Sequence, residues 1–441
     1  MDIMIAGAGT VGYSLAQNFS HKHNVIVVDK VLDTLDRLEE HIDIMTLLGD
    51  VEDPQTYAAL QIKEMDLFIA VTDSDEANLL SALIIDDNIV IKKKIIRLKN
   101  DYFLDSKVLD KLNIQHAIFP DIDTAEKVAS LFTFPKANNV KSFSQCQEKM
   151  ISIKVQCPEP SLYTVAVLND RNVKVLGIER EKVFFIPGEE EAIQNGDLLY
   201  LFGRRQSIEQ LSAGLDVKMP SVIRKVAIFG ANPLAQKIAK KLAEKELEIK
   251  MIDKNREFCQ MASETLQGEV TVIHTVYEEH TLFEAEGLKN ADMIIAAGMN
   301  DEKNIVKCIE AKEYGIEKVV AINNDSAYYN LMHQLGIVVV RGSKVGAYYT
   351  ILENISSSTI VTQRHFCGGR AVLFMRKVYV GSALIGKKIS GRQPDNVLML
   401  ILRETQLYRL DEAENLQAGD ILLVSANTQE EESVHKWIYT L

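Results

Sequence analysis

The sequence contains two copies of one unit, and this duplication constrains the fold more than any other feature. Landmarks of different residue types recur at an offset of 223 to 226 residues. They are the pairs Gly7/Gly230, Asp29/Asp253, Asn78/Asn304 and Gly196-Asp197/Gly419-Asp420. Because repetition at one fixed spacing is the signature of duplicated structural units, the chain is predicted to consist of two copies of a unit of about 220 residues.

Each copy begins with strands and helices in strict alternation. In the first copy, short apolar runs predict strands at residues 3–6, 25–28, 44–48, 67–71, 95–98 and 116–119, and helical patterns cover 10–19, 32–41, 54–60, 76–85, 103–112 and 124–132. Matching runs in the second copy lie at 225–229, 249–252, 271–274, 293–297, 318–322 and 337–340. Continuous apolar runs are typical of parallel strands covered on both faces. The fold class predicted is therefore α/β, with two Rossmann-like doubly wound parallel sheets.

A smaller α+β domain is predicted after each parallel sheet. Strand patterns at residues 151–155, 173–179, 183–186 and 198–203 lack a nucleotide turn, and the polar residues 136–148 are predicted to form a connection. We expect Rossmann-like domains at 1–135 and 223–345 and small domains at 149–216 and 371–441. A helix at 345–355 is predicted to join the last two domains.

Composition excludes several classes of function. The net charge of -13 argues against a nucleic-acid binder, which needs a basic face. No apolar run reaches the roughly 18 residues of a membrane span, and the N-terminus leads directly into a strand, so we expect a cytoplasmic protein. The five cysteines form no C-x-x-C pair and the nine histidines form no H-E-x-x-H motif. We therefore predict reduced core thiols and no metal site.

A glycine motif in the first copy predicts a nucleotide site. The segment Gly7-Ala8-Gly9-Thr10-Val11-Gly12 is G-x-G-x-x-G, placed between a predicted strand and a predicted helix. Gly7 would allow the tight turn, Gly9 the approach of backbone N–H groups to a pyrophosphate, and Gly12 close packing of the helix on the sheet. Asp29 ends the second strand, where its carboxylate can accept hydrogen bonds from ribose hydroxyls and repel a 2′-phosphate. This arrangement favours NAD or an adenine nucleotide over NADP. A glycine turn that only packs is the alternative reading.

Further candidate residues follow the other strands of the first copy. Asp50 follows the third strand, and Thr72 and Asp73 follow the fourth, where each could contact a ligand. In the same segment, Ser74 or Asp75 could cap the next helix. Arg97 lies among apolar neighbours in the fifth strand and needs an anionic partner, either a phosphate or one of these acids. Lys30 and Val51 complete the predicted cofactor-binding set.

These motifs, in this order and in duplicate, resemble the TrkA family of Trk potassium-uptake regulatory subunits. The quoted segments are G-A-G-T-V-G, V-V-D, L-G-D, A-V-T-D-S-D-E-A-N and I-I-R, and the likeness extends over essentially the whole chain. The resemblance implies two regulator-of-potassium-conductance (RCK) units in a cytoplasmic homotetramer, peripheral on the inner face of the membrane. It also implies binding of NAD(H), with ATP or ADP as further ligands, and gating of a potassium transporter of the TrkH type. Residues that match ligand-contacting positions of that family are Gly7, Gly9, Thr10, Val11, Gly12, Asp29, Asp50, Thr72 and Arg97.

The second copy departs from the motif. Gly230-Ala231-Asn232-Pro233 keeps only the first glycine, and Pro233 removes one N–H donor. The side chain of Asn232 would occupy space that phosphates need, whereas Asp253 is retained. We therefore expect the second fold to serve assembly, with its pocket empty, weakened or altered in ligand choice and with Gly230 and Asp253 as a weaker site.

Two other functions are compatible with the same turn. An NAD-dependent oxidoreductase would need an acid or base beside the nicotinamide, and the duplicated small domains offer no convincing candidate. A pure assembly scaffold would not need the intact first motif. The sequence thus favours a regulatory protein without catalytic residues, and the oxidoreductase remains the alternative.

Overall fold

The computed structural model describes residues 1–58, 60–275, 279–356, 361–386, 396–410, 412–413 and 415–441. Contacts divide the chain into two compact units. Unit 1 contains residues 1–124 and 341–354, and unit 2 contains residues 125–340 and 355–441.

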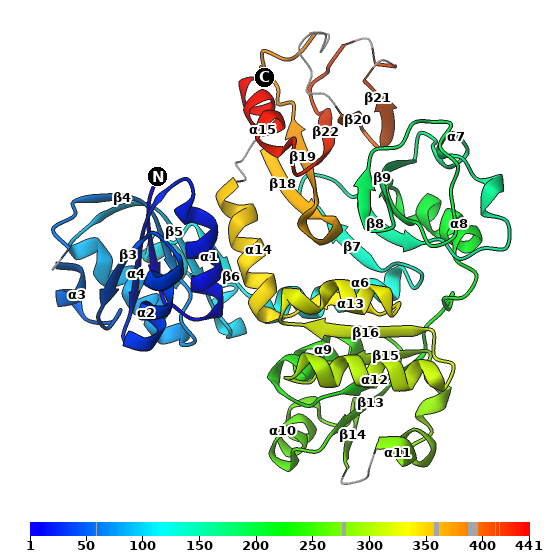
Figure 1. The fold of residues 1–441 in the computed structure, drawn as a ribbon, viewed down its shortest axis with the longest axis horizontal. Coiled ribbons are helices and arrows are strands. Elements are labelled where there is room, and N and C mark those ends of the chain that lie inside the picture. The colour runs from blue at the N-terminus through cyan, green and yellow to red at the C-terminus, as the bar shows by residue number, and fades with distance from the viewer. Residues whose placement is uncertain (59, 276–278, 357–360, 387–395, 411, 414) are drawn as a thin grey trace. The chain divides into compact units, whose positions relative to one another are not determined.

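Unit 1 is a six-stranded parallel sheet with helices, labelled in Figure 1. Its strand order is β3-β2-β1-β4-β5-β6, the doubly wound order of Rossmann folds. The elements are β1 Asp2–Ala6, α1 Thr10–Ser20, β2 Asn24–Asp29, α2 Leu32–His41, β3 Met45–Leu48, α3 Pro54–Ala58, β4 Glu64–Ala70, α4 Asp75–Ile84, η1 Ile85–Asp87, β5 Val90–Arg97, η2 Asp101–Phe103, α5 Val108–Lys111, β6 His116–Ile118, the start of α6 Pro120–Thr133, and nearly all of α14 Ser343–Ser356. Residues 3–6 of β1 are fully buried, as expected for a central strand covered on both faces.

Unit 2 contains a second sheet of the same kind. Its order, β14-β13-β12-β15-β16-β17, repeats that of unit 1 strand for strand, which confirms the predicted duplication and fold class. The elements are β12 Lys225–Phe229, α9 Pro233–Ala243, β13 Glu248–Asp253, α10 Arg256–Leu266, β14 Thr271–His274, α11 Glu279–Ala285, η4 Leu288–Asn290, β15 Met293–Ala296, α12 Asp301–Glu313, β16 Lys318–Asn323, η5 Ser326–Tyr328, α13 Tyr329–Gln334 and β17 Val338–Arg341. Helices α9, α10 and α12 pack on these strands (Figure 1).

Two five-stranded sheets complete unit 2. The first has the order β10-β9-β11-β8-β7 and the second β18-β19-β22-β20-β21, and every pair of strands recorded in them is antiparallel. The elements are β7 Asn139–Ser142, β8 Lys149–Lys154, η3 Pro160–Leu162, α7 Val165–Leu168, β9 Val173–Arg180, β10 Val183–Phe185, β11 Leu198–Gly203, α8 Arg205–Leu215, β18 Val361–Phe366, η6 Cys367–Gly369, β19 Ala371–Lys377, β20 Leu398–Arg403, β21 Gln406–Arg409, β22 Ile421–Asn427 and α15 Glu431–Thr440. One hydrophobic cluster joins both sheets, including the rings of Tyr200 and Phe366, whose centroids lie 4.9 Å apart.

Both small sheets begin earlier than the sequence predicts. Strand β7 lies within residues 136–148, which were expected to form a polar connection, and β18 precedes the expected start at 371. In β7 only Val140 is buried, so its apolar pattern is too short to reveal a strand. In β18 the alternation is hidden because Thr362 and Gln363 are buried despite being polar.

The Gly-Asp pairs have a structural role. Asp197 and Asp420 are buried, and each carboxylate receives two hydrogen bonds of 2.8–2.9 Å from one guanidinium, that of Arg180 or Arg403. Each aspartate also accepts a backbone N–H bond at 2.8 Å from the turn before it. The pairs therefore tie the turns before β11 and β22 to the ends of β9 and β20.

The helix predicted at 345–355 is present as α14, but its first twelve residues belong to unit 1. There, Thr124 Oγ1 donates to Arg341 O at 3.0 Å, Lys93 Nζ donates to Asn354 O at 2.7 Å, and Ser343 donates to Asp121. Conversely, Ala125, Val128 and Leu131 of α6 belong to a cluster that also contains core residues of the second parallel sheet. Each parallel sheet is thus completed by a helix from the other copy.

Candidate functional site

The glycine turn of unit 1 has the geometry that its motif predicts. Gly7 has φ +108° and donates its N–H to Val28 O at 2.8 Å. A Cβ on Gly12 would lie 1.8 Å from Gly7 O, so no other residue fits there. Gly9 is the N-cap of α1, makes no side-chain cap, and has open space where a Cβ would stand. The first N–H groups of α1, from Thr10 and Val11 onward, therefore lack a capping side chain, and a helix terminus of this kind can receive phosphate.

Asp29 holds this turn in place. Its Oδ2 accepts the N–H of Ala8 at 2.6 Å, and its Oδ1 accepts the N–H of Val31 at 2.9 Å. Each carboxylate oxygen keeps a further lone pair, so the predicted contact with a ribose is compatible with these bonds. The second copy repeats the arrangement: Asp253 accepts from Ala231 at 2.7 Å and Asn255 at 2.9 Å. The retention of Asp253 therefore has a structural reason that does not require a ligand.

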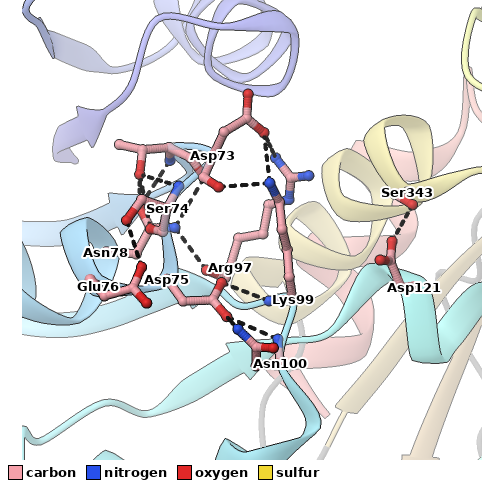
Figure 2. A network of polar contacts seen from close by, with 11 residues as sticks. Asp73, Ser74, Asp75, Glu76, Asn78, Arg97, Lys99, Asn100, Asp121 and Ser343 are labelled. Carbon is pink, nitrogen blue, oxygen red and sulfur yellow. Dashed lines mark hydrogen bonds and ion pairs between the residues drawn. The ribbon is translucent and has the colours of Figure 1, made fainter. Parts of the chain in front are cut away.

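Asn78 connects the ends of β4 and β5, as Figure 2 shows. Its Oδ1 accepts from the N–H of Thr72 at 2.9 Å and from Thr72 Oγ1 at 2.7 Å. Its Nδ2 donates to Thr72 O at 3.1 Å and to Arg97 O at 2.8 Å. Asn78 is 1% exposed, and it thus sets the positions of two predicted ligand residues. The sequence showed Asn78 only as a repeat landmark, and its recurrence as Asn304 was the available signal.

Arg97 is buried without a strong partner. Its side chain is 8% exposed, its Nη1 lies 3.4 Å from Asp73 Oδ1, and its Nε has no hydrogen-bond partner among the described residues. Asp73 itself is exposed and also contacts Lys99, whose Nζ donates to Asp73 O at 2.6 Å (Figure 2). A guanidinium so poorly compensated can take an additional anion.

Neighbouring acids hold the loops around Arg97. Ser74 caps α4 by accepting the N–H of Ala77 at 3.1 Å, so the cap predicted at Ser74 or Asp75 is Ser74. Asp75 instead accepts the backbone N–H groups of Lys99 at 2.7 Å and Asn100 at 2.9 Å. The loop after β5 is thereby tied to the start of α4.

The remaining predicted residues lie at the ends of β2 and β3. Lys30 and Asp50 approach to 3.8 Å and are both substantially exposed, so the pair can open to admit a ligand. Val51 is buried, and its carbonyl accepts the Tyr57 hydroxyl at 2.8 Å. Burial and the nearby Asp50 raise the pKa of Tyr57, which therefore stays protonated as a donor. The side chain of Val51 thus packs in the core, and only its backbone could contact a ligand.

The second copy fills the equivalent position with its own side chain. Asn232 Oδ1 accepts the N–H of Ala235 at 3.1 Å and caps α9, and its Nδ2 donates to Ala297 O at 2.6 Å. Asn232 is 7% exposed, and Pro233 occupies the first helical position. Gly230 has a φ of +118°, and a Cβ at this position would lie 2.7 Å from Ala297 O, so the backbone itself requires glycine here. The helix N-terminus that accepts phosphate in a nucleotide site is here capped internally.

No group of three or more His, Cys, Asp or Glu suited to a metal ion occurs in the described part of the chain, and the five cysteines are free thiols. Among the helices built from described residues, none is long and apolar enough to cross a bilayer.

The chain is similar in sequence to known proteins over most of its length. The chain is 27% identical over 444 residues to a Trk system potassium uptake protein TrkA homolog of Archaeoglobus fulgidus, covering 99% of each chain. It is 26% identical over 380 residues to Trk system potassium uptake protein TrkA of Halomonas elongata, covering 84% of this chain and 82% of that protein.

Solved structures share the fold over the whole chain. The GsuK channel matches with a TM-score of 0.65 and 17% identity, covering 100% of this chain and 79% of that one. A structure of GsuK bound to NAD matches with a TM-score of 0.63 and 17% identity, with the same coverage. The GsuK RCK domain gives a TM-score of 0.60 at 17% identity, covering 100% of this chain and 95% of that one.

The TrkA-N domain matches twice, at residues 3–120 and 226–341. These ranges are the two parallel sheets, and together they make up more than half of the chain. The protein therefore belongs to the TrkA-N family, with two copies of the domain in tandem.

Proposed function

We propose that this chain is a cytoplasmic regulatory subunit that binds an adenine nucleotide in its first Rossmann-like domain and so gates a membrane potassium transporter. NAD(H) is the proposed cofactor, with ATP or ADP as further ligands. Support comes from the similarity to Trk system potassium uptake proteins and from GsuK structures of the same fold that are bound to NAD and to ADP.

The observation that carries the proposal is Arg97. It ends β5, on the carboxyl side of the sheet, where doubly wound folds bind nucleotides. Its buried Nε lacks a partner and its contact with Asp73 is long, so a phosphate would supply what the protein does not. Another phosphate of the same ligand could be held by the uncapped N–H groups that follow Gly9.

In this proposal the ligand regulates and is not consumed. A nucleotide shifts a conformational equilibrium only by its differential affinity for two states. A hundredfold preference corresponds to about 2.7 kcal/mol, enough to reverse a closely balanced equilibrium. The second copy, whose helix is capped by Asn232, would contribute assembly, with one strong nucleotide site per chain.

The finer features of the proposal concern partners and place. The transporter would be an integral membrane protein of the TrkH type, contacted from the inner face of the membrane. The regulatory subunit would form a homo-oligomer, with four copies as the expected number. No catalytic residue and no nucleic-acid partner are proposed.

The test is calorimetric titration of ADP and NADH into the full chain and into Arg97→Met. We expect at least tenfold weaker binding for the variant, because charge-assisted bonds to phosphate contribute about 1.5–3 kcal/mol. Arg376→Met is the matched control, since Arg376 also has a buried unpartnered Nε but lies in β19, in the second small sheet. The Arg376→Met variant should bind ADP with the affinity of the parent chain.

Transport links binding to function. Cells that depend on this chain for potassium uptake should grow poorly at low potassium with Arg97→Met and normally with Arg376→Met. Normal growth of the Arg97 variant despite lost binding would refute nucleotide gating. Measurable oxidation of NADH with turnover would favour the oxidoreductase instead.

A further inference from the structure

Unit 2 contains a cavity that the nucleotide site does not use. Its volume is about 900 Å³, within the range of sites that enclose small metabolites. One wall comes from the first small sheet, at the end of β8 and the β9–β10 turn, and the other from the ends of α12 and α13 beside the second parallel sheet. A molecule bound there would touch both domains.

Four lysines from four separate segments line this cavity: Lys154, Lys182, Lys218 and Lys312. None of them forms an ion pair with a described residue. In a chain with a net charge of -13, four lysines gathered without ion-pair partners are a local excess of positive charge. Such a concentration of positive charge attracts anions.

Carboxylates in the wall offset only part of this charge. Glu179 is already neutralised, because Arg370 Nη2 donates to it at 2.6 Å, and Cys367 Sγ and Tyr200 OH donate at 3.0 and 3.1 Å. The two other acids are Glu181 and Glu317, so the lysines exceed the free carboxylates two to one. Burial lowers the pKa of His333, so this side chain contributes a neutral ring.

The wall also contains a polar atom that lacks its bond. Asn138 Oδ1 is buried and has no hydrogen-bond partner among the described residues, although the Asn138 backbone N–H is fixed on Ser152 O at 2.7 Å. Buried amide groups are nearly always satisfied, so an unsatisfied one in a cavity wall indicates a missing partner.

We propose that this cavity binds a small multivalent anion, bearing phosphate or carboxylate groups, and that this site is independent of the nucleotide site in unit 1. Lys154, Lys218 and Lys312 are the principal anion contacts. Because one wall belongs to each domain, the bound anion stabilises the state in which the first small sheet and the second parallel sheet stay together.

Two probes test this proposal: inorganic tripolyphosphate for the phosphate source and citrate for the carboxylate source. Titrations use the full chain with Arg97→Met, so that the nucleotide site does not contribute. The test variant adds Lys154→Gln, Lys218→Gln and Lys312→Gln. The control adds Lys240→Gln, Lys245→Gln and Lys289→Gln, which remove the same charge from positions of unit 2 outside the cavity lining.

At least one probe should bind the parent chain and the control with equal affinity and the test variant at least thirtyfold more weakly. Equal weakening of probe binding in both triple variants would mean non-specific attraction and would overturn the proposal. Failure of both probes to bind the parent chain would overturn it as well. Should the test variant fail to fold, acetylation of the parent chain decides the matter. The probe should slow acetylation of Lys154, Lys218 and Lys312 at least threefold and leave Lys240 unaffected, and equal rates with and without probe would refute the site.

Discussion

Replacement of Asn78 by alanine separates ligand positioning from stability, because the duplication supplies its own control. Asn78 makes four hydrogen bonds, to Thr72 and Arg97, and Asn304 makes three, to Gly298 and Ile322. The two side chains are 1% and 2% exposed. Each alanine variant leaves buried backbone groups unpaired at about 1–3 kcal/mol per group, so each should lose about 2–5 kcal/mol of stability.

Only the first variant should lose nucleotide affinity. Asn78→Ala frees Thr72 and the backbone of Arg97, and displacement of a positioned contact by about 1 Å can weaken an interaction by tenfold or more. Asn304→Ala should bind ADP as the parent chain does, because the second turn is capped by Asn232.

The assay pairs titration of ADP with denaturant unfolding of both variants and the parent. ADP should bind Asn78→Ala at least tenfold more weakly at a temperature where the variant is folded. Unchanged affinity for ADP in folded Asn78→Ala would refute the positioning role. Equal losses of affinity in both variants would show that the effect is general destabilisation.

Three further outcomes follow from the structure. Gly9→Ala should keep the thermal stability of the parent but bind ADP more weakly, since a Cβ at this position meets no protein atom within 4 Å. Gly12→Ala should unfold the first domain, because its Cβ would lie 1.8 Å from Gly7 O. Thermal unfolding and titration with ADP distinguish the two variants, and equal thermal stability of both would contradict this reading. Arg97→Met should raise the unfolding temperature of the ligand-free protein, because it removes a buried cation with a weak partner, and a clear fall would show that Asp73 compensates it fully. Lys318 is fully buried and donates to Ala137 O at 2.5 Å, and burial lowers its pKa from 10.5 to about 7. Between these pH values the unfolded chain holds a proton that the folded chain has lost, so the free energy of unfolding should rise with pH by at most about 1.4 kcal/mol per pH unit and should be constant below pH 7. Lys318→Met should remove this slope when unfolding is measured across that pH range.

The central strands and the glycine turn could be predicted from the sequence because their physical requirements are local. An uninterrupted apolar run, a glycine at positive φ and a helix starting at Thr10 identify the first βα element without knowledge of the rest. Edge strands β7 and β18 could not be predicted, since one buried apolar residue or buried polar side chains give no recognisable alternation.

The candidate site was predictable only in part for the same reason. Residues of the glycine motif and Arg97 stand out by type, whereas Asn78 acquires its role through contact with Arg97, nineteen positions further along the chain. Similarly, the apolar face of α14 predicts that this helix packs but not on which sheet. Such long-range partnerships depend on tertiary packing, which a single sequence does not display.

The helices that each parallel sheet receives from the other copy make the two repeats mutually dependent. A polypeptide ending after Leu215 would keep the apolar residues Val128 and Leu131 without much of the core that covers them, and it would lack α14 altogether. A chain cut between its two repeats would therefore give fragments that each expose apolar surface, although the repeat itself suggests that boundary. A single repeat could cover that surface only by taking the missing helix from another molecule.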